Sequence, residues 1–519
     1  MTERLPTADP GPQTTGESRP AARKGARAAV GSQRSAIINL LPIILLGAAL
    51  RFHSLFANTF HADEALFAQW ARSIAVWRDP LLLAQAVDKP PQLFYLQALF
   101  YPLFGPVEWA ARMPSFIASM LLIPLTAQLT RRLTGDRTAV LAAALIVAVA
   151  PLTIQFSATA FSDPLLTFWL MAALYAIARP QVDNRQPQVR AALAGLLFGL
   201  AVATKYQALL FAPLVVGVGW LAGRRRGDWL GGLGGLAVVL VALLLWQWAR
   251  PSSAGLVALQ WANIGGLRPA HSWELWPRAL ETARLWGLAA GWPLVGIGVL
   301  TLGLVVWFRR GRHRIAPVES LLILFVSGYM LLHWLWAVPV WDRYLLPIFP
   351  LVALLGGRAT SCALAAVSVQ AGRRPVYAAA IGLILLVSMP AALAARQGGF
   401  PIGGQPAADG GAARVARLLK DAPYGTVLYD HWYSWHWQYH LFDGRVFVSW
   451  VPHVDALLAD LAVFSGNGAD RYVALPSSMA AAPVARRLAA NGYVLESVDG
   501  QDEAASMILY RIIGSEIAR

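Results

Sequence analysis

Long runs of apolar residues dominate the chain between residues 37 and 395, and short polar segments separate them. A helix needs about 20 apolar residues to cross the hydrocarbon core of a bilayer, within a range of about 17–25. The pattern therefore predicts a helical bundle with about eleven membrane spans. Their approximate limits are 37–55, 113–130, 138–156, 164–178, 191–204, 206–223, 228–248, 285–308, 316–337, 344–366 and 376–395.

Composition supports a membrane protein and excludes several other classes. Of the 519 residues, 57% are hydrophobic and only 14% are charged, whereas about a quarter is usual in a soluble domain. These values exclude a soluble enzyme and a disordered chain. The single cysteine, Cys362, excludes intramolecular disulfides and a zinc site made of four thiolates.

The distribution of Lys and Arg predicts the orientation of the chain in the membrane. With the N-terminus in the cytoplasm, the cytoplasmic segments hold 22 basic residues and the short outer segments hold 10. This excess is typical of cytoplasmic loops. It explains the net charge of +15 without nucleic acid as a partner. We therefore expect a multi-pass protein of the plasma membrane, with its C-terminal part outside the cytoplasm.

Three segments are expected. Residues 1–36 are polar and rich in Pro, Gly and Arg, which predicts a disordered cytoplasmic tail. Residues 37–395 form the membrane module, and residues 396–519 form a small α/β domain after a Gly/Pro-rich linker, Gln397–Gly411. In that domain, strands are predicted at Thr426–Tyr429, Val446–Trp450, Arg471–Leu475, Tyr493–Ser497 and Met507–Ile512, and helices near 411–420, 453–462 and 480–491.

The first outer loop, about 56–112, contains two predicted helices. The first follows His61 and places one apolar stripe along the membrane surface, formed by Leu66, Trp70, Ile74 and Trp77. The second is the apolar stretch Gln92–Phe104, which is shorter than a typical span and is expected to be interfacial or re-entrant.

Two adjacent acids, Asp63 and Glu64, begin the first of these helices. One interpretation is structural: Asp63 caps the helix and Glu64 offsets its dipole. The other is catalytic, because a carboxylate at the mouth of a water-poor groove can take a proton from an attacking hydroxyl. Adjacent residues point in different directions on a helix, so their roles should differ.

Further charged groups lie at the predicted outer ends of other spans. Lys89 is either an interfacial lysine or a phosphate ligand, and Asp163 is either a helix cap before Pro164 or part of a site. Lys205 lies on the same side, as do Asp342, Arg343 and Tyr344. A carboxylate base together with cations for a phosphate leaving group would suit glycosyl or phosphoryl transfer.

These motifs resemble the GT-C membrane glycosyltransferases of the protein O-mannosyltransferase and aminoarabinose-transferase superfamily. The resemblance covers roughly residues 37–360. The motifs are Asp63-Glu64, Asp88-Lys89-Pro90-Pro91, Arg112-Met113-Pro114-Ser115, Phe161-Ser162-Asp163, Leu200-Ala201-Val202-Ala203-Thr204-Lys205-Tyr206 and Arg343-Tyr344-Leu345-Leu346-Pro347.

The resemblance implies transfer of a sugar, with inversion, from a polyprenyl-phosphate donor to an extracytoplasmic protein, lipid or glycan. It implies that Asp63 is the base, that Lys89 holds the donor phosphate, that Asp163 lines the same cavity and that Arg343 is a second phosphate contact. No cofactor is required. In the aminoarabinose branch an acid before the lysine and a later histidine can hold a divalent metal, and the matching pair here is Asp88 and His271.

Two other classes remain as alternatives: a transporter or lipid flippase, and a non-catalytic scaffold that presents the outer domain. A transporter usually places polar groups near the bilayer midplane between repeated halves, and no repeat is visible here. An aromatic run, His431–His440, is interpreted as a packed patch that seats the outer domain, with a sugar-stacking surface as the alternative. His436 and His440 in this run lack the intervening Glu of a zinc-protease motif.

Overall fold

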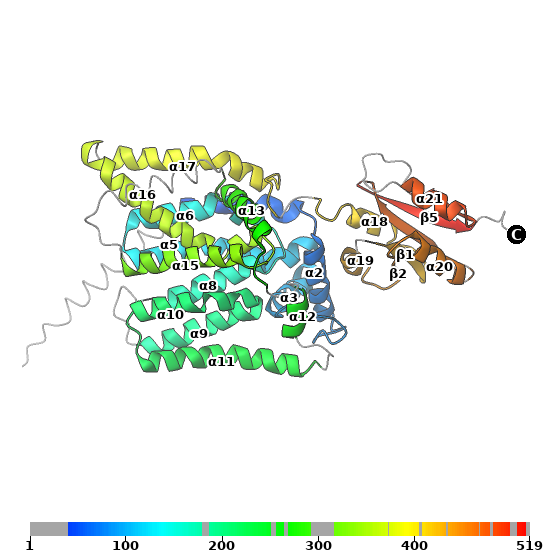
Figure 1. The fold of residues 1–519 in the computed structure, drawn as a ribbon, viewed down its shortest axis with the longest axis horizontal. Helices are drawn as coiled ribbons and strands as arrows, with labels where there is room; N and C mark the ends of the chain where they lie inside the picture. The colour runs from blue at the N-terminus through cyan, green and yellow to red at the C-terminus, as the bar shows by residue number, and fades with distance from the viewer. Residues whose placement is uncertain are drawn as a thin grey trace, which may run out of the picture.

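In the computed structural model, a bundle of long helices carries a small sheet domain at one end (Figure 1). The residues described are 40–178, 186–250, 256–263, 268–291, 316–371, 373–403, 407–431, 434–464, 466, 468–477, 481–498 and 506–514. The predicted tail 1–36 and most of the predicted span 285–308 lie outside these residues.

The bundle is built from the apolar runs that the sequence contains. Its helices are Leu40–Ala57, α5 (Glu108–Thr134), α6 (Arg137–Val149), α7 (Pro151–Ser157), α8 (Asp163–Ile177), α9 (Pro187–Thr204), η1 (Tyr206–Phe211), α10 (Ala212–Leu221), α11 (Arg226–Trp248), α12 (Leu256–Asn263), α13 (Ser272–Ala290), α15 (Pro317–Leu335), η2 (Asp342–Leu345), α16 (Phe349–Ala371) and α17 (Arg373–Arg396).

Five of the described helices are long and apolar enough to cross a membrane, or up to six if the bent pair α6 and α7 counts as one span. Four shorter apolar helices accompany them. The chain is thus a multi-pass membrane protein with a mainly helical fold. Eleven spans remain a prediction.

The predicted span 138–156 corresponds to two helices, because α6 and α7 meet at a bend of 55°. Pro151 has no N–H to donate and begins α7, while Ala150 has an extended backbone. The guanidinium of Arg51, which is fully buried, donates to the carbonyl oxygens of Val147 and Ala148 at 2.8 Å each. It also donates to Thr153 Oγ1 at 2.9 Å, so one side chain joins both sides of the bend.

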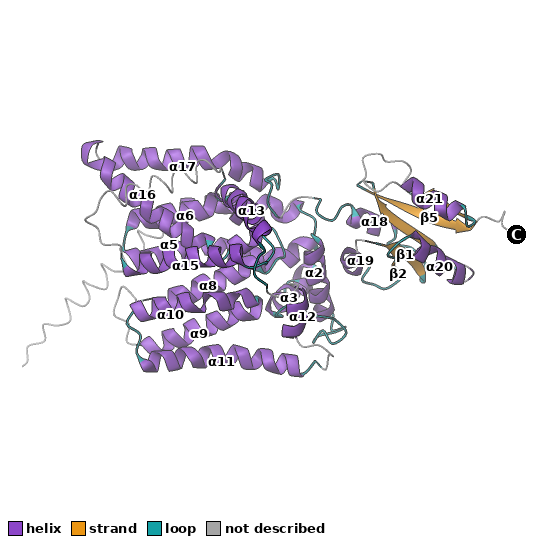
Figure 2. Ribbon diagram, in the orientation of Figure 1, coloured by secondary structure: helices purple, strands orange, loops and turns teal. Residues whose placement is uncertain are grey.

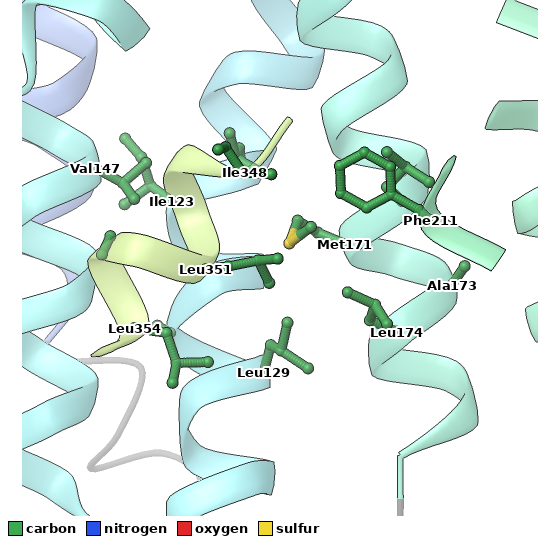
Figure 3. Packing of buried hydrophobic residues seen from close by; sticks show 14 of the residues in the cluster. Ile123, Leu129, Val147, Met171, Ala173, Leu174, Phe211, Ile348, Leu351 and Leu354 are labelled. Atoms are coloured by element: carbon green, nitrogen blue, oxygen red, sulfur yellow. The ribbon is translucent and has the colours of Figure 1, made fainter. Parts of the chain in front are cut away.

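Close packing of small and branched residues holds the bundle together. Figure 3 shows Leu129, Met171, Phe211 and Leu351 from four helices meeting in its interior. The glycines of α9 and α11 allow an even closer approach, since a Cβ at Gly235 would lie 2.0 Å from the Ala192 carbonyl oxygen.

The first outer loop forms three helices, α2 (Ala62–Ala75), α3 (Gln92–Ala98) and α4 (Tyr101–Phe104). The predicted helix 92–104 is therefore divided in two. The position of α2 on the membrane surface stays a prediction. Gln69 and Ser73, on its polar side, are buried against the rest of the protein, whereas Trp77 is 81% exposed.

The C-terminal domain is a five-stranded mixed sheet in the order β2-β1-β3-β5-β4 (Figure 2). β1 pairs in parallel with β2 and β3, and β5 pairs antiparallel with β3 and β4. The five predicted strands agree with the structure to within two residues at each end. The elements are α18 (Ala412–Leu418), β1 (Thr426–Asp430), α19 (Ser434–His440), β2 (Val446–Trp450), α20 (Val454–Phe464), β3 (Arg471–Pro476), α21 (Ala481–Ala489), β4 (Tyr493–Ser497) and β5 (Met507–Gly514).

Helix α19 was not predicted from the sequence. It packs against α2 on the side that carries Arg72. The ring of Tyr439 lies edge-on to Phe60, with centroids 5.0 Å apart, and His436 Nε2 is 3.0 Å from the Phe60 carbonyl oxygen. Arg72 Nη1 donates to the Tyr439 carbonyl oxygen at 2.8 Å. For its described residues, the aromatic run seats the domain on the first outer loop as predicted; Trp432 and Tyr433 lie outside the described residues.

Candidate active site

Asp63 stands in the first turn of α2, and it does not cap the helix. The N-cap is His61, whose Nδ1 accepts from the Asp63 amide at 3.2 Å. The Glu64 carboxylate reaches back and accepts from the His61 amide at 2.8 Å. This capping box satisfies the helix end and leaves the Asp63 side chain available for other contacts.

Glu64 is buried and fully engaged inside the protein, with 2% of its surface exposed. Its carboxylate also accepts from the Ala160 amide and lies 3.6 Å from Arg112 Nε. Arg112 in turn donates to the Asn58 carbonyl oxygen at 2.5 Å. The two adjacent acids thus differ, as expected: Glu64 ties α2 to the turn before α8, and Asp63 faces outward.

The Asp63 carboxylate is ion-paired with Arg343, with Oδ2 3.1 Å from Nη1. The Asp63 side chain is 36% exposed and that of Arg343 is 15% exposed. Burial alone would raise the pKa of the Asp63 carboxyl. The positive charge of Arg343, aided by His61 and Lys89, outweighs this effect and lowers the pKa below its ordinary value. Asp63 is therefore a carboxylate at neutral pH.

Arg343 is positioned by aromatic rings and by the backbone of η2. Its guanidinium carbon lies 4.2 Å from the ring centroid of Trp341 and 4.9 Å from that of Phe161. The neighbouring Asp342 accepts from the Arg343 amide at 2.7 Å and from the Gly403 amide at 2.6 Å. The start of the linker thereby fixes the short helix that presents Arg343.

Asp163 and Lys205 form a buried ion pair with Nζ 2.7 Å from Oδ1. The Asp163 side chain is 1% exposed and that of Lys205 is 20% exposed. Ser162 occupies the N-cap position of α8 and makes no side-chain cap, so Asp163 is not the predicted helix cap. The Lys205 ammonium also lies 4.7 Å from the ring centroid of Tyr344. Burial lowers the pKa of Lys205 even though Asp163 opposes the shift.

Lys89 completes the group from the segment before α3. Its ammonium lies 2.8 Å and 3.0 Å from the two carboxylate oxygens of Asp88 and 5.3 Å from the ring centroid of Phe67. Its side chain is 24% exposed. Pro90 and Pro91 follow directly and restrict the backbone that carries the lysine.

Asp63, Lys89, Asp163, Lys205, Arg343 and Tyr344 gather at one end of the bundle. Electrostatic effects connect the separate pairs: Lys89 acts on Asp63 and on Lys205, and Arg343 acts on Asp163. Three cations and an accessible carboxylate therefore share one region. This set can bind a phosphate and accept a proton nearby.

The possible metal pair does not form a metal site. Both carboxylate oxygens of Asp88 face Lys89, while His271 precedes α13 with its ring stacked on Trp273 at 4.2 Å. Among the described residues, no three His, Cys, Asp or Glu side chains are grouped to hold a metal ion. The Lys89 ammonium beside the Asp88 carboxylate would also repel a metal cation, so these residues do not fit a metal.

Several contacts at the site were not identified from the sequence. Phe161 belongs to a quoted motif, yet its ring supports Arg343 rather than only filling space. Thr204, next to Lys205, donates to Gln92 Oε1, which joins the end of α9 to α3. Arg51 was left without a role. The sequence signal for this role is an arginine at the end of an apolar run, because a charge buried there needs hydrogen-bond partners.

Residues 88–249 match the sequence model of the family described as dolichyl-phosphate-mannose-protein mannosyltransferase. A related protein is the undecaprenyl phosphate-alpha-4-amino-4-deoxy-L-arabinose arabinosyl transferase of Pseudomonas aeruginosa strain LESB58, 31% identical over 194 residues. That match covers 36% of this chain and 35% of the relative, so it spans about a third of each.

Solved structures extend the likeness to nearly the whole chain. ArnT from Cupriavidus metallidurans, bound to undecaprenyl phosphate, superposes with a TM-score of 0.62 at 16% identity, over 91% of this chain and 97% of that one. This chain has the GT-C fold. The archaeal oligosaccharyltransferase AglB from Archaeoglobus fulgidus, in complex with an inhibitory peptide and a dolichol-phosphate, has a TM-score of 0.54 at 13% identity, over 94% of this chain and 75% of that one. The predicted resemblance to the GT-C glycosyltransferases is confirmed.

Proposed function

We propose that this GT-C protein is an integral membrane glycosyltransferase. It moves a sugar from a polyprenyl-phosphate donor to an acceptor outside the cytoplasm, with inversion at the anomeric carbon. The observation that carries this proposal is the meeting of Asp63 with Lys89, Lys205 and Arg343 at one end of the bundle. Asp63 and Lys89 belong to the first outer loop, whereas Lys205 and Arg343 come from distant parts of the sequence.

The three cations supply the donor phosphate site. Arg343 presents a planar fork of N–H donors, and Lys89 is a compact point charge; both are suited to phosphate oxygens. Lys205 lies beside them and is held by Asp163, and Tyr344 covers its ammonium. As the bond to the sugar breaks, negative charge grows on the leaving phosphate, and these cations stabilise that charge.

Asp63 is the general base of the proposed reaction. The acceptor oxygen forms a bond to the anomeric carbon, and the bond between that carbon and the phosphate oxygen breaks. The bonding electron pair leaves with the polyprenyl phosphate, and the acceptor proton passes to the Asp63 carboxylate. When Arg343 turns from Asp63 to the phosphate, the carboxylate loses its strongest stabilising neighbour and becomes a better base. Glu64 holds α2 in place rather than exchanging the proton.

Relatives support the donor class. Two of the similar solved structures contain a polyprenyl phosphate, undecaprenyl phosphate in one and dolichol-phosphate in the other. A donor with a long lipid tail enters sideways from the bilayer, which suits a site at the end of membrane-spanning helices. The phosphate is already a good leaving group, so a nucleotide-binding loop is unnecessary.

The proposed topology places the site outside the cytoplasm. In it, eleven spans cover residues 37–395, the N-terminal tail 1–36 is cytoplasmic and the domain 396–519 is extracytoplasmic. The excess of basic residues in the opposite loops supports this orientation. It puts the site in the cell envelope, where the acceptor is a protein, a lipid or a glycan.

The direct test uses purified protein in lipid nanodiscs with radiolabelled polyprenyl-phosphate sugars and a membrane extract as the source of acceptors. Transfer by the wild type should be lost in Asp63→Asn. The exposed Asp421→Asn in the C-terminal domain is the matched control and should keep full activity. Donor binding without transfer would instead favour a transporter or flippase, and equal transfer by both variants would remove Asp63 as the base.

A further inference from the structure

A cavity lies between the C-terminal domain and the first outer loop, and none of the proposed catalytic residues lines it. Its volume is about 560 Å³, within the usual range for small-ligand sites. Its walls come from the end of α2, the start of α5, and from α18, α19 and the beginning of β2. It therefore spans the joint between the two parts of the protein.

The rim of this cavity carries unpaired positive charge from the C-terminal domain. Arg417, Lys420 and Arg445 line it and are exposed. Among the described residues, none of the three has an ion-pair partner. The positive charge of the rim does not reflect the composition of the whole domain, since residues 396–519 contain 10 basic and 12 acidic residues. In contrast, Arg72 in the same wall is already engaged by Asp443 at 3.6 Å.

The interior of the cavity contains a polar group, the His440 imidazole, that lacks a hydrogen-bond partner at Nε2 among the described residues. His440 Nε2 is buried 3.8 Å from Glu108 Oε1 and makes no hydrogen bond within the described part of the chain. Burial lowers the pKa of His440 to about 4, and nearby His436, Arg417 and Arg72 act in the same direction. A neutral imidazole suits a hydroxyl group, so the cavity combines cations at its rim with a hydroxyl partner inside.

An exposed aromatic cluster lies beside this cavity. Trp109, one residue beyond the cavity wall, has its ring centroid 4.9 Å from Phe104 and 5.6 Å from Phe56. Phe56 is itself 5.2 Å from Phe52. Phe52, Phe56 and Phe104 are each about half exposed. Phe52 and Phe56 lie in the last two turns of the apolar helix Leu40–Ala57, and Phe104 ends α4. Aromatic residues are typical of the headgroup level.

We propose that this cavity binds the phosphate-bearing headgroup of an anionic membrane lipid. The phosphate meets Arg417, Lys420 and Arg445, a headgroup hydroxyl meets His440, and the acyl chains pass along the aromatic cluster into the bilayer. Clustered Lys and Arg side chains near a membrane surface attract anionic headgroups. The bound lipid ties the C-terminal domain to the membrane surface, at a place separate from the donor site.

The test measures lipid binding to the full-length, delipidated protein in detergent by native mass spectrometry. Phosphatidylglycerol is titrated against phosphatidylcholine, with wild type, Arg417→Ala/Lys420→Ala and the control Arg486→Ala/Arg487→Ala on α21. We expect phosphatidylglycerol to bind preferentially to the wild type and to the control. Its binding to the double variant should be at least about tenfold weaker. All these changes are at exposed positions. A second rim variant, Arg445→Ala, is measured in the same way and should also weaken the binding of phosphatidylglycerol.

Three results would overturn the proposal. One is equal binding of phosphatidylglycerol to the wild type and to both rim variants. Another is equal binding of phosphatidylcholine and phosphatidylglycerol. The third is full competition by inorganic phosphate or by glycerol 1-phosphate at matched concentration, which would identify a site for free phosphate. Because no sugar transfer is measured, these outcomes are independent of the proposed glycosyltransferase activity.

Discussion

The carboxylate of Asp63 and the guanidinium of Arg343 are joined across 280 residues of sequence, with Oδ2 3.1 Å from Nη1. This contact connects the start of the first outer loop to the segment between α15 and α16. It keeps the proposed base charged and the proposed phosphate ligand oriented before any donor arrives. The pairing therefore links donor binding to the strength of the base.

Replacing Arg343 by Gln should change both binding and pH dependence. Arg343 lowers the pKa of Asp63 against the effect of burial, so its removal should move the acid limb of kcat/KM to higher pH. The KM for the donor should rise about tenfold or more, because a charged hydrogen bond to phosphate contributes about 1.5–3 kcal/mol. Rate–pH profiles test this, with Arg284→Gln, an exposed residue of α13, as the control. An acid limb that stays in place would separate Arg343 from the base.

Replacing Asp63 by Asn should lower kcat by about 10²–10⁴-fold, the usual contribution of a general base. Binding of polyprenyl phosphate should remain, because Lys89, Lys205 and Arg343 are still present. Single-turnover kinetics and lipid binding measured on the same preparation check the two effects separately. Loss of lipid binding together with activity would point to damage to the fold instead.

Local patterns in the sequence predicted the elements but not their contacts. Strands such as Val446–Trp450 follow from apolar runs between turn residues, and the structure has the same limits. The break at Pro151 was missed because the apolar run continues through it. Helix α19 was missed because aromatic residues fill every side of it. The contact of Asp63 with Arg343 depends on how distant segments pack, and a single sequence does not reveal such packing.

The Lys205 and Asp163 pair should behave as a unit in folding. Lys205→Met leaves the carboxylate of Asp163, which is 1% exposed, without its partner and should cost about 3–5 kcal/mol. The double variant Lys205→Met/Asp163→Asn should recover much of this loss. Thermal unfolding in detergent of the two single variants and the double variant forms the test. Additive losses would show that the two groups do not depend on each other.

Chelation should leave sugar transfer unchanged. Both carboxylate oxygens of Asp88 accept hydrogen bonds from Lys89. The described residues contain no group of three side chains that could hold a metal ion. The proposed reaction therefore relies on cationic side chains to stabilise the phosphate. Transfer assayed after extended treatment with EDTA tests this expectation. A loss of activity that added Zn²⁺ or Mg²⁺ restores would require a metal in the mechanism.

Arg51 should be essential for stability although the proposed reaction gives it no direct role. Its guanidinium makes five hydrogen bonds, to Gly47, Ser119, Val147, Ala148 and Thr153. Two of the acceptors are carbonyl groups at the end of α6, next to the break before Pro151. Without this cation the Ala148 carbonyl would lose its Arg51 donor, and the Val147 carbonyl would keep only the Thr153 hydroxyl. Water cannot replace the lost donor in an apolar bundle.

Arg51→Met should therefore destabilise the protein by about 3 kcal/mol or more. Activity should fall as well, because α7 leads into the turn whose Ala160 amide binds Glu64 and whose end carries Asp163. The exposed Arg137→Met, at the start of α6, provides the matched control, and thermal unfolding in detergent provides the measurement. Equal stability of the two variants would mean that the bend in the α6–α7 pair is held by packing alone. A stable but inactive Arg51→Met would instead place the role of Arg51 in positioning Asp163.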